Sequence, residues 1–378
     1  MSLMAKIHSK ALALGIPLQA HLDITYRCNE RCEHCYLEHD DKGEMTFEEI
    51  SGLFAQLADA GVFFLTLSGG EVLLRRDFFD IVARARALLF NVKLKTNAVL
   101  IRAPEAQRLR ALGVEQVNVS VYSHRPEIHD AITKLPGSLR RTLDGIRALR
   151  AAGLKVAVAN VMMRSNFPDQ RAVAALAREL GASYLTDPTV SPMMDGDRGV
   201  LSLRIPGQAL PELFQDPDLV GDPAEFCAPP PPVSDGDLNC LPCSAGHTAC
   251  YISPYGDVYP CVQFPLPSGN IRRQKFLDIW KNSPQLAEVR SIRTRDLPVC
   301  SGCSHVASCT RCPGQAWMEG SMRGPSSADC EKSFYRTGIP SANMLARGWR
   351  PETNDAFWSG ERQGVGLVQI APLPQAAA

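Results

Sequence analysis

Short apolar runs alternate with amphipathic stretches along the first half of this chain. Six runs are apolar or rich in β-branched residues, and several are apolar enough to be strands buried on both faces. These predicted strands lie at 20–25, 63–67, 92–96, 116–121, 156–162 and 183–186. The spacing between successive runs leaves room for a helix.

The intervening stretches carry apolar residues at helical spacing. Thr46 and Glu49 match a capping box, in which each residue caps the other's backbone N–H. Pro168 suits the first turn of a later helix. The apolar stripes that follow these signals, and one that follows Ser138, are Phe47, Ile50, Phe54 and Leu57, then Leu139, Leu143, Ile146 and Leu149, then Leu176 and Leu180.

Four of the predicted helices end in a glycine that is followed at once by a strand, in the segments 57–61, 109–113, 149–153 and 176–181. A glycine can adopt the left-handed conformation that ends a helix and turns the chain back. Repeated strand–helix units form a parallel sheet with helices on its outer side. Six units are too few for a closed eight-unit barrel, so the pattern predicts an open, partial (β/α)6 barrel of the TIM type in the α/β class.

Bulk composition narrows the class of protein. The chain has 378 residues, 45% of them hydrophobic, and a formal net charge of zero, which does not favour nucleic acid or an anionic membrane as partner. We find no signal peptide and no apolar run long enough to span a membrane. Thirteen cysteines without a secretory signal indicate a reducing cytoplasm and metal ligation, not a disulfide framework.

The pattern changes after Asp187. Prolines and Asp–Gly turns predict a connector with little regular structure, and the segment 240–330 then holds nine of the thirteen cysteines. Apart from apolar stretches at 276–280 and 284–292, this segment is poor in core residues and would be held together by its ligands. We could assign no role to the tail that follows Tyr335.

Three cysteines, Cys28, Cys32 and Cys35, lie in C-x3-C-x2-C spacing directly after the first predicted strand. Three thiolates can hold three irons of a [4Fe–4S] cubane and leave the fourth iron open, although a zinc site is the alternative for such a spacing. The motif resembles that of the radical S-adenosylmethionine (radical SAM) enzymes. His34 stands where that family usually has another aromatic residue.

The second predicted strand is followed by Ser68-Gly69-Gly70-Glu71. Alone, this segment reads as a turn with an N-capping acid. In the radical SAM family, a Gly-Gly-Glu at this place holds the amino group of S-adenosylmethionine (SAM), which implies that Gly69, Gly70 and Glu71 bind it. By the same resemblance, the strand-end residues that contact SAM are Ser120, Asn160 and Arg164; strand-end capping is the alternative role for them.

The C-terminal cysteines resemble the SPASM extension of radical SAM maturases, except that two residues and not three separate Cys309 from Cys312. The resemblance implies two auxiliary [4Fe–4S] clusters. By position, the first uses Cys243, Cys250, Cys261 and Cys312, and the second uses Cys300, Cys303, Cys309 and Cys330. Two zinc sites are the alternative, Cys240 could replace Cys243, and Cys227 is left over.

The resemblance covers most of the chain and implies a partial barrel followed by a small cysteine-rich SPASM domain. We expect an N-terminal extension (1–19), the barrel (20–190), a connector (191–239), the SPASM domain (240–335) and a tail (336–378). The implied reaction is reductive cleavage of SAM to a 5′-deoxyadenosyl radical, which abstracts hydrogen from a peptide or protein and leads to a cross-link, an oxidation or an epimerisation. The implied partners are an electron donor such as flavodoxin or ferredoxin and a separate peptide-recognition protein, unless the barrel mouth holds the peptide directly.

Two other functions stay open at this point. One is a radical SAM dehydrogenase or rearrangement enzyme that acts on a small metabolite or pro-cofactor. The other is a non-catalytic iron–sulfur or zinc module. The sequence singles out no acid–base residue and no hydrogen donor.

Overall fold

The computed structural model describes residues 2–39 and 41–350, which form two compact units. Unit 1 comprises Met1–Arg204 with Ala245–Arg290, and unit 2 comprises Ile205–Ser244 with Ser291–Ala378, each as far as it is described. The apolar end of the tail, beyond residue 350, lies outside the described residues.

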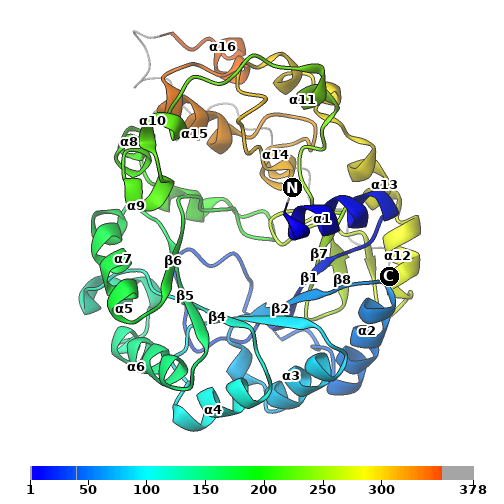
Figure 1. The fold of residues 1–378 in the computed structure, drawn as a ribbon, viewed down its shortest axis with the longest axis vertical. Coiled ribbons are helices and arrows are strands. Elements are labelled where there is room, and N and C mark those ends of the chain that lie inside the picture. The colour runs from blue at the N-terminus through cyan, green and yellow to red at the C-terminus, as the bar shows by residue number, and fades with distance from the viewer. Residues whose placement is uncertain (1, 40, 351–378) are drawn as a thin grey trace. The chain divides into compact units, whose positions relative to one another are not determined.

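Unit 1 is built on six parallel strands in the order β6-β5-β4-β3-β2-β1, with helices on their outer side (Figure 1). The strands are β1 Gln19–Thr25, β2 Phe64–Gly69, β3 Asn91–Thr96, β4 Gln116–Ser120, β5 Lys155–Val161 and β6 Ser183–Asp187. The outer helices are α2 Phe47–Asp59, α3 Phe78–Ala87, α4 Ala103–Ala111, α5 Pro126–Thr133, α6 Ser138–Ala151 and α7 Gln170–Glu179. The predicted partial (β/α)6 barrel is confirmed, and each predicted strand lies within two residues of an observed one.

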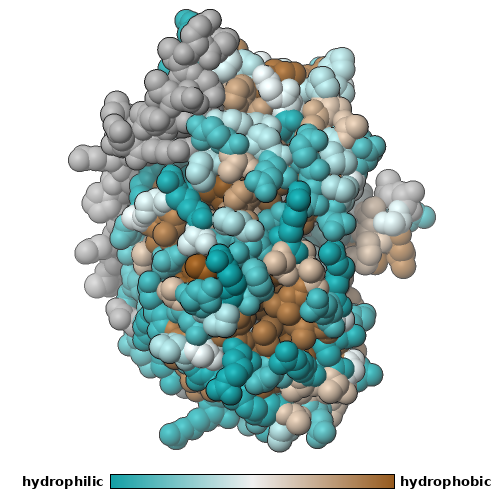
Figure 2. All heavy atoms as spheres, turned by 90° about the vertical axis from the view of Figure 1, so that its left-hand side faces the viewer, coloured by the Kyte–Doolittle hydropathy of each residue, from teal (hydrophilic) through white to brown (hydrophobic). Residues whose placement is uncertain are grey.

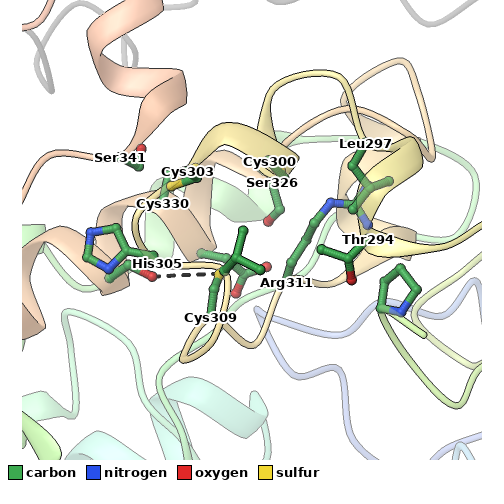
Figure 3. A pocket seen from close by; sticks show the side chains of 14 residues that line it. Thr294, Leu297, Cys300, Cys303, His305, Cys309, Arg311, Ser326, Cys330 and Ser341 are labelled. Atoms are coloured by element: carbon green, nitrogen blue, oxygen red, sulfur yellow. Dashed lines mark hydrogen bonds between the residues drawn. The ribbon is translucent and has the colours of Figure 1, made fainter. Parts of the chain in front are cut away.

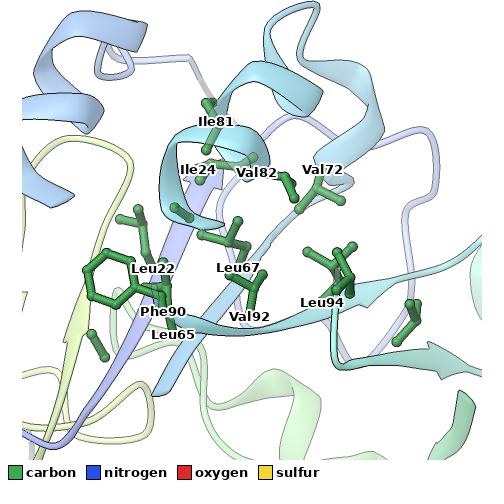
Figure 4. Packing of buried hydrophobic residues seen from close by; sticks show 14 of the residues in the cluster. Leu22, Ile24, Leu65, Leu67, Val72, Ile81, Val82, Phe90, Val92 and Leu94 are labelled. Atoms are coloured by element: carbon green, nitrogen blue, oxygen red, sulfur yellow. The ribbon is translucent and has the colours of Figure 1, made fainter. Parts of the chain in front are cut away.

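The core lies between the sheet and these helices. Alternate residues of each strand face the helices, such as Leu22 and Ile24 of β1, and they pack with Ile81 and Val82 of α3 (Figure 4). The other face of β1 carries His21 and the buried Asp23, so the inner side of the sheet is polar. This alternation decides which side chains reach the inner side.

The helix ends follow the sequence pattern closely. Thr46 and Glu49 form the predicted capping box, and Ile50, Phe54 and Leu57 are buried. The four helix-terminating glycines, at 61, 113, 153 and 181, all have a positive φ. Pro168 is the exception, because it lies in a separate 3-10 turn, η2 Phe167–Asp169, directly before α7.

A segment from far along the chain extends the same sheet. Strand β7 Ala249–Ile252 pairs with β1 in parallel, and β8 Asp257–Tyr259 and β9 Gly269–Asn270 follow in antiparallel order. The register pairs His21 with Tyr251, which brings Tyr251 to the inner side. The sequence did not predict these strands. Other elements of this unit are α1 Leu3–Leu14, η1 Val72–Leu74, η3 Gly199–Leu203 and α12 Phe276–Asn282, with α13 Pro284–Ser291 reaching its boundary.

Unit 2 consists of short helices and loops, with no strand among its described residues. Its elements are η4 Gly207–Ala209, α8 Leu210–Phe214, α9 Pro217–Val220, α10 Pro223–Phe226, α11 Asp235–Asn239, η5 Thr294–Asp296, η6 Cys300–Gly302, α14 Pro313–Met318, α15 Ser327–Thr337 and α16 Ala342–Ala346. A small apolar cluster in it includes Met344 and Trp349. The expected domain limits remain predictions.

Most of the surface in Figure 2 is hydrophilic, with apolar residues in small patches. Within the described part of the chain, no helix is both long enough and apolar enough to cross a membrane.

Arg75 fixes the end of β1, directly before the cysteine loop. Its Nη1 donates to the carbonyls of Ile24 and Met45, at 2.9 and 2.8 Å, and its Nε and Nη2 bind Asp77. Replacing Arg75 by Met leaves the two buried carbonyls unpaired, so we expect a loss of about 3 kcal/mol in the free energy of unfolding. Urea denaturation measures this loss.

The matched control is Arg76→Met, because Arg76 is the neighbouring arginine and less buried than Arg75. Its effect should stay within about 0.5 kcal/mol. Equal effects of the two substitutions would contradict the role given to Arg75.

Candidate active site and cysteine sites

The loop with Cys28, Cys32 and Cys35 leaves the carboxyl end of β1, and all three thiols are half-buried. Helix α5 holds the loop, since the backbone N–H of Arg31 donates to the carbonyl of Thr133 at 2.9 Å. In barrels of this type, chemistry takes place at this end of the strands. The three predicted ligands therefore lie where a barrel of this type places its chemistry.

Burial raises the pKa of all three thiols, that of Cys28 to about 12. Thiols bind metal as thiolates, so metal binding at this loop would release the protons of these thiols. Glu30 lies beside them, 3% exposed, and burial raises its pKa to about 7. Its Oε2 accepts a hydrogen bond from Cys32. Glu30 was not predicted from the sequence, because its position between two ligands is the only signal.

The Gly69-Gly70 pair packs against the beginning of the same loop. The Gly70 N–H donates to the Thr25 carbonyl at 2.8 Å, and the Glu71 N–H donates to the Arg27 carbonyl at 2.9 Å. A Cβ on Gly69 would lie 2.1 Å from the Thr25 oxygen, and one on Gly70 would lie 2.3 Å from the Arg27 oxygen. The close approach of these glycines is thus to the backbone before Cys28, and their contact with SAM stays a prediction.

Glu71, which directly follows the two glycines, is fully buried. Three groups donate to its carboxylate: the Thr96 hydroxyl, the Asn97 N–H at 2.9 Å and the Leu73 N–H at 3.1 Å. A carboxylate has about four acceptor positions, so one remains for a further donor. Among the described residues no cation pairs with Glu71, and burial raises its pKa. The site therefore fits a ligand that brings a positive amine.

The other residues predicted to contact SAM, Ser120, Asn160 and Arg164, have different surroundings. Ser120 ends β4 on the inner side, half-buried. Asn160 shares its face of β5 with Val156 and Val158, which pack in the core, and its amide bonds Tyr184 and Asn166. Arg164 donates to the Arg204 carbonyl at 2.9 Å. The role of these three residues toward SAM stays a prediction.

A chain of polar groups runs along the inner side below the cysteine loop. Asp23 accepts from the Tyr251 hydroxyl at 2.9 Å and contacts His21 Nε2 at 3.1 Å, and the Tyr251 and Tyr26 hydroxyls lie 2.6 Å apart. Burial lowers the pKa of the inward-facing Lys95, and the charge of Asp23 opposes that shift. A substrate inside the barrel would meet these groups.

His34 of the cysteine loop takes part in a cluster of aromatic rings with Tyr122 and His129. The His34 ring packs edge-on against Tyr122, with centroids 4.7 Å apart, and Tyr122 stacks on His129. Burial lowers the pKa of His34 to about 4, so the ring is neutral. His34 thus takes part in aromatic packing at the place where the family usually has another aromatic residue.

In unit 2, Cys300, Cys303, Cys309 and Cys330 line a single pocket (Figure 3). Donors surround the sulfurs: the Ala342 N–H lies 3.4 Å from Cys303 Sγ, and the Ser333 hydroxyl lies 3.7 Å from Cys309 Sγ. The four cysteines predicted for the second auxiliary cluster are therefore grouped. The assignment of each as a ligand stays a prediction.

The four cysteines predicted for the first auxiliary cluster belong to both units. In unit 1, burial raises the pKa of Cys250 to about 12, and the charge of Cys261 adds to that shift. In unit 2, burial raises the pKa of Cys312, and Cys243 lies near enough to contribute. Of the remaining two, Cys227 hydrogen-bonds the Phe214 carbonyl and Cys240 is exposed.

All thirteen cysteines lie among the described residues, and none is in a disulfide. No three Cys, His, Asp or Glu side chains within those residues converge so as to hold a single metal ion.

Comparison with known proteins places these sites in a family. Residues 22–177 match the Radical SAM superfamily, and residues 243–304 match the SPASM iron–sulfur cluster-binding domain. The chain is 30% identical to the mycofactocin maturase MftC of Mycobacterium tuberculosis over 312 residues, which cover 78% of each protein. It is also 28% identical to the AdoMet-dependent heme synthase of Methanosarcina barkeri, over 78% of this chain and 90% of that protein.

The fold is shared with SuiB of Streptococcus suis, solved with its precursor peptide SuiA. The TM-score is 0.68 at 18% identity, over 86% of this chain and 80% of SuiB. The chain belongs to the radical SAM superfamily and carries a SPASM domain: it is an enzyme whose cofactors are S-adenosylmethionine and [4Fe–4S] clusters.

Proposed function

We propose that this enzyme matures a peptide: it removes a hydrogen atom from a peptide or protein substrate, which is then cross-linked, oxidised or epimerised. The observation that carries the proposal is the 30% identity to a maturase across 78% of both chains. The shared fold with SuiB, which was solved with a precursor peptide, adds support.

The proposal includes the ligands of the clusters. Cys28, Cys32 and Cys35 hold the cluster that binds SAM, and the two groups of C-terminal cysteines hold the auxiliary clusters. We further propose a cytoplasmic location, an electron donor such as flavodoxin or ferredoxin, and a substrate that a separate recognition protein can present.

When bound, SAM and its cluster supply the one-electron chemistry that removes a hydrogen atom. The residues of this chain orient the participants. Glu71, already held by Thr96 and two backbone N–H groups, accepts the SAM amine without having to reorganise. The Gly69-Gly70 contact fixes the distance between Glu71 and the cysteine loop. Asp23, Tyr251 and Tyr26 offer the substrate a polar wall on the inner side.

A small metabolite is the second candidate substrate. The relative named a heme synthase supports it, because the chain covers 90% of that protein. The two candidates differ in what stimulates SAM cleavage, so one assay separates them.

Substitution of Gly70 tests the contact between the Gly-Gly-Glu segment and the cysteine loop. In Gly70→Ala the new Cβ would meet backbone oxygens and displace the loop. With three [4Fe–4S] clusters, anaerobically purified wild-type protein should hold about twelve irons, and the variant about eight. Iron and sulfide analysis provides the count.

Gly52→Ala is the control for this substitution. Gly52 lies inside α2, and nothing stands within 4 Å of the position that the alanine methyl would take. This variant should keep about twelve irons and gain up to about 1 kcal/mol in stability. A Gly70→Ala protein with a full iron count would contradict the role given to this contact.

Incubation with a candidate peptide tests the function itself. The reconstituted enzyme, given SAM, a reductant and a short peptide encoded beside its own gene, should release 5′-deoxyadenosine and change the peptide's mass or stereochemistry. Mass spectrometry and chiral amino-acid analysis detect these changes, and Cys28→Ala should abolish both. Release of 5′-deoxyadenosine that rises with a metabolite, while every such peptide stays unchanged, would support the second candidate instead.

A further inference from the structure

The pocket of the second auxiliary site contains a buried positive charge. Arg311 is 8% exposed and lines the same pocket as Cys300, Cys303, Cys309 and Cys330 (Figure 3). In sequence it lies between Cys309 and Cys312, where the spacing departs from the SPASM pattern. The family resemblance assigned it no role.

Backbone carbonyls hold the guanidinium in place. Its Nε donates to the Gly324 carbonyl at 2.9 Å, and its Nη2 donates to the carbonyls of Met322 and Gly324. Its Nη1 is buried and has no hydrogen-bond partner among the described residues. Arg311 is therefore rigidly placed and keeps a donor for a group inside the pocket.

The other charged groups of the pocket do not balance Arg311. The buried Asp329 pairs with Lys332 at 2.7 Å and accepts from the Cys312 N–H. His305 bonds the Ile339 carbonyl through Nε2, and burial lowers its pKa, which favours the neutral ring. Within the described residues, Arg311 forms no ion pair with a carboxylate.

An unbalanced charge in the interior is unfavourable unless an opposite charge compensates it. Neutral thiols do not compensate a guanidinium, whereas a cubane with four thiolates does. Its oxidised core carries two positive charges against four negative ligands, so the net charge is minus two, and reduction by one electron makes it minus three. Near Arg311, each of these states is stabilised, and the more negative one is stabilised most.

We propose that Arg311 raises the reduction potential of the auxiliary cluster held by Cys300, Cys303, Cys309 and Cys330. The inference rests on the proposed ligand set for that cluster. Net charge is among the factors that set iron–sulfur potentials, and Arg311 places a buried positive charge in the lining of this pocket. Among the donors described here, the Ala342 N–H and the Ser333 hydroxyl carry no charge.

The positive charge of Arg311 lies close enough to Cys300 to affect its thiol. Burial raises the pKa of the Cys300 thiol, and the positive charge of Arg311 is the largest influence that lowers it again.

An EPR-monitored redox titration measures the effect. The background is Cys28→Ala/Cys32→Ala/Cys35→Ala, which leaves only the auxiliary clusters. Arg311→Gln should lower one of the two midpoint potentials by at least about 59 mV, a tenfold change in a one-electron equilibrium, and leave the other in place. Arg311→Lys keeps the charge and should recover most of the difference.

Arg295→Gln is the matched control, because Arg295 is an exposed arginine of the same unit and does not line the pocket. It should leave both potentials unchanged. Unchanged potentials in Arg311→Gln, or a Lys variant as low as the Gln variant, would overturn the inference.

A measurement on the unsubstituted protein can still overturn the inference if Arg311→Gln does not load its irons. Labelling with [15N]arginine should give a 15N coupling to a reduced auxiliary cluster in pulsed EPR, and its absence would overturn the inference. Failure of wild-type protein to bind about twelve irons would refute the ligand sets as well, whereas full loading with unchanged potentials refutes the role of Arg311 alone.

Discussion

An interior charge without a counter-charge is the constraint on which both functional regions of this protein depend. Glu71 is fully buried and receives three neutral donors but no cation among the described residues. Arg311 is buried beside four cysteines and has no carboxylate partner among them. Each arrangement becomes favourable when a group of opposite charge binds. The first fits the amine of SAM and the second fits an anionic cluster.

The scaffold places the first of these charges with short-range contacts. The end of β1 continues into the cysteine loop, and the backbone of Gly70 and Glu71 bonds the backbone of Thr25 and Arg27. No side chain fits between the two segments. The cysteine loop and the Gly-Gly-Glu segment are thus held together at one edge of the sheet, and the proposed chemistry, which passes an electron from cluster to SAM, requires such proximity.

Local pattern in the sequence was enough to predict the barrel, whereas the two C-terminal cysteine groups came from the family resemblance and stay predictions. Strand and helix periodicity depends on neighbouring residues, and so do capping signals such as Thr46 with Glu49. The pairing of Ala249–Ile252 with β1 could not be predicted, because a four-residue apolar run carries no information about a partner more than two hundred residues away. The Asp23–Tyr251 contact depends on that pairing. Asn160 shares its strand face with core residues and bonds Asn166, contacts that its position at a strand end did not indicate, and its role toward SAM stays a prediction.

Binding of SAM to the reduced protein tests the central claim most directly: one iron of the Cys28–Cys32–Cys35 cluster is open, and Glu71 receives the SAM amine. EPR spectra of the anaerobically reduced enzyme should show one cluster signal with g values that shift when SAM is added. Glu71→Gln keeps the shape but loses the charge, and it should need at least about tenfold more SAM for the same shift. A wild-type spectrum that SAM leaves unchanged, or an equal SAM requirement in both proteins, would contradict the account.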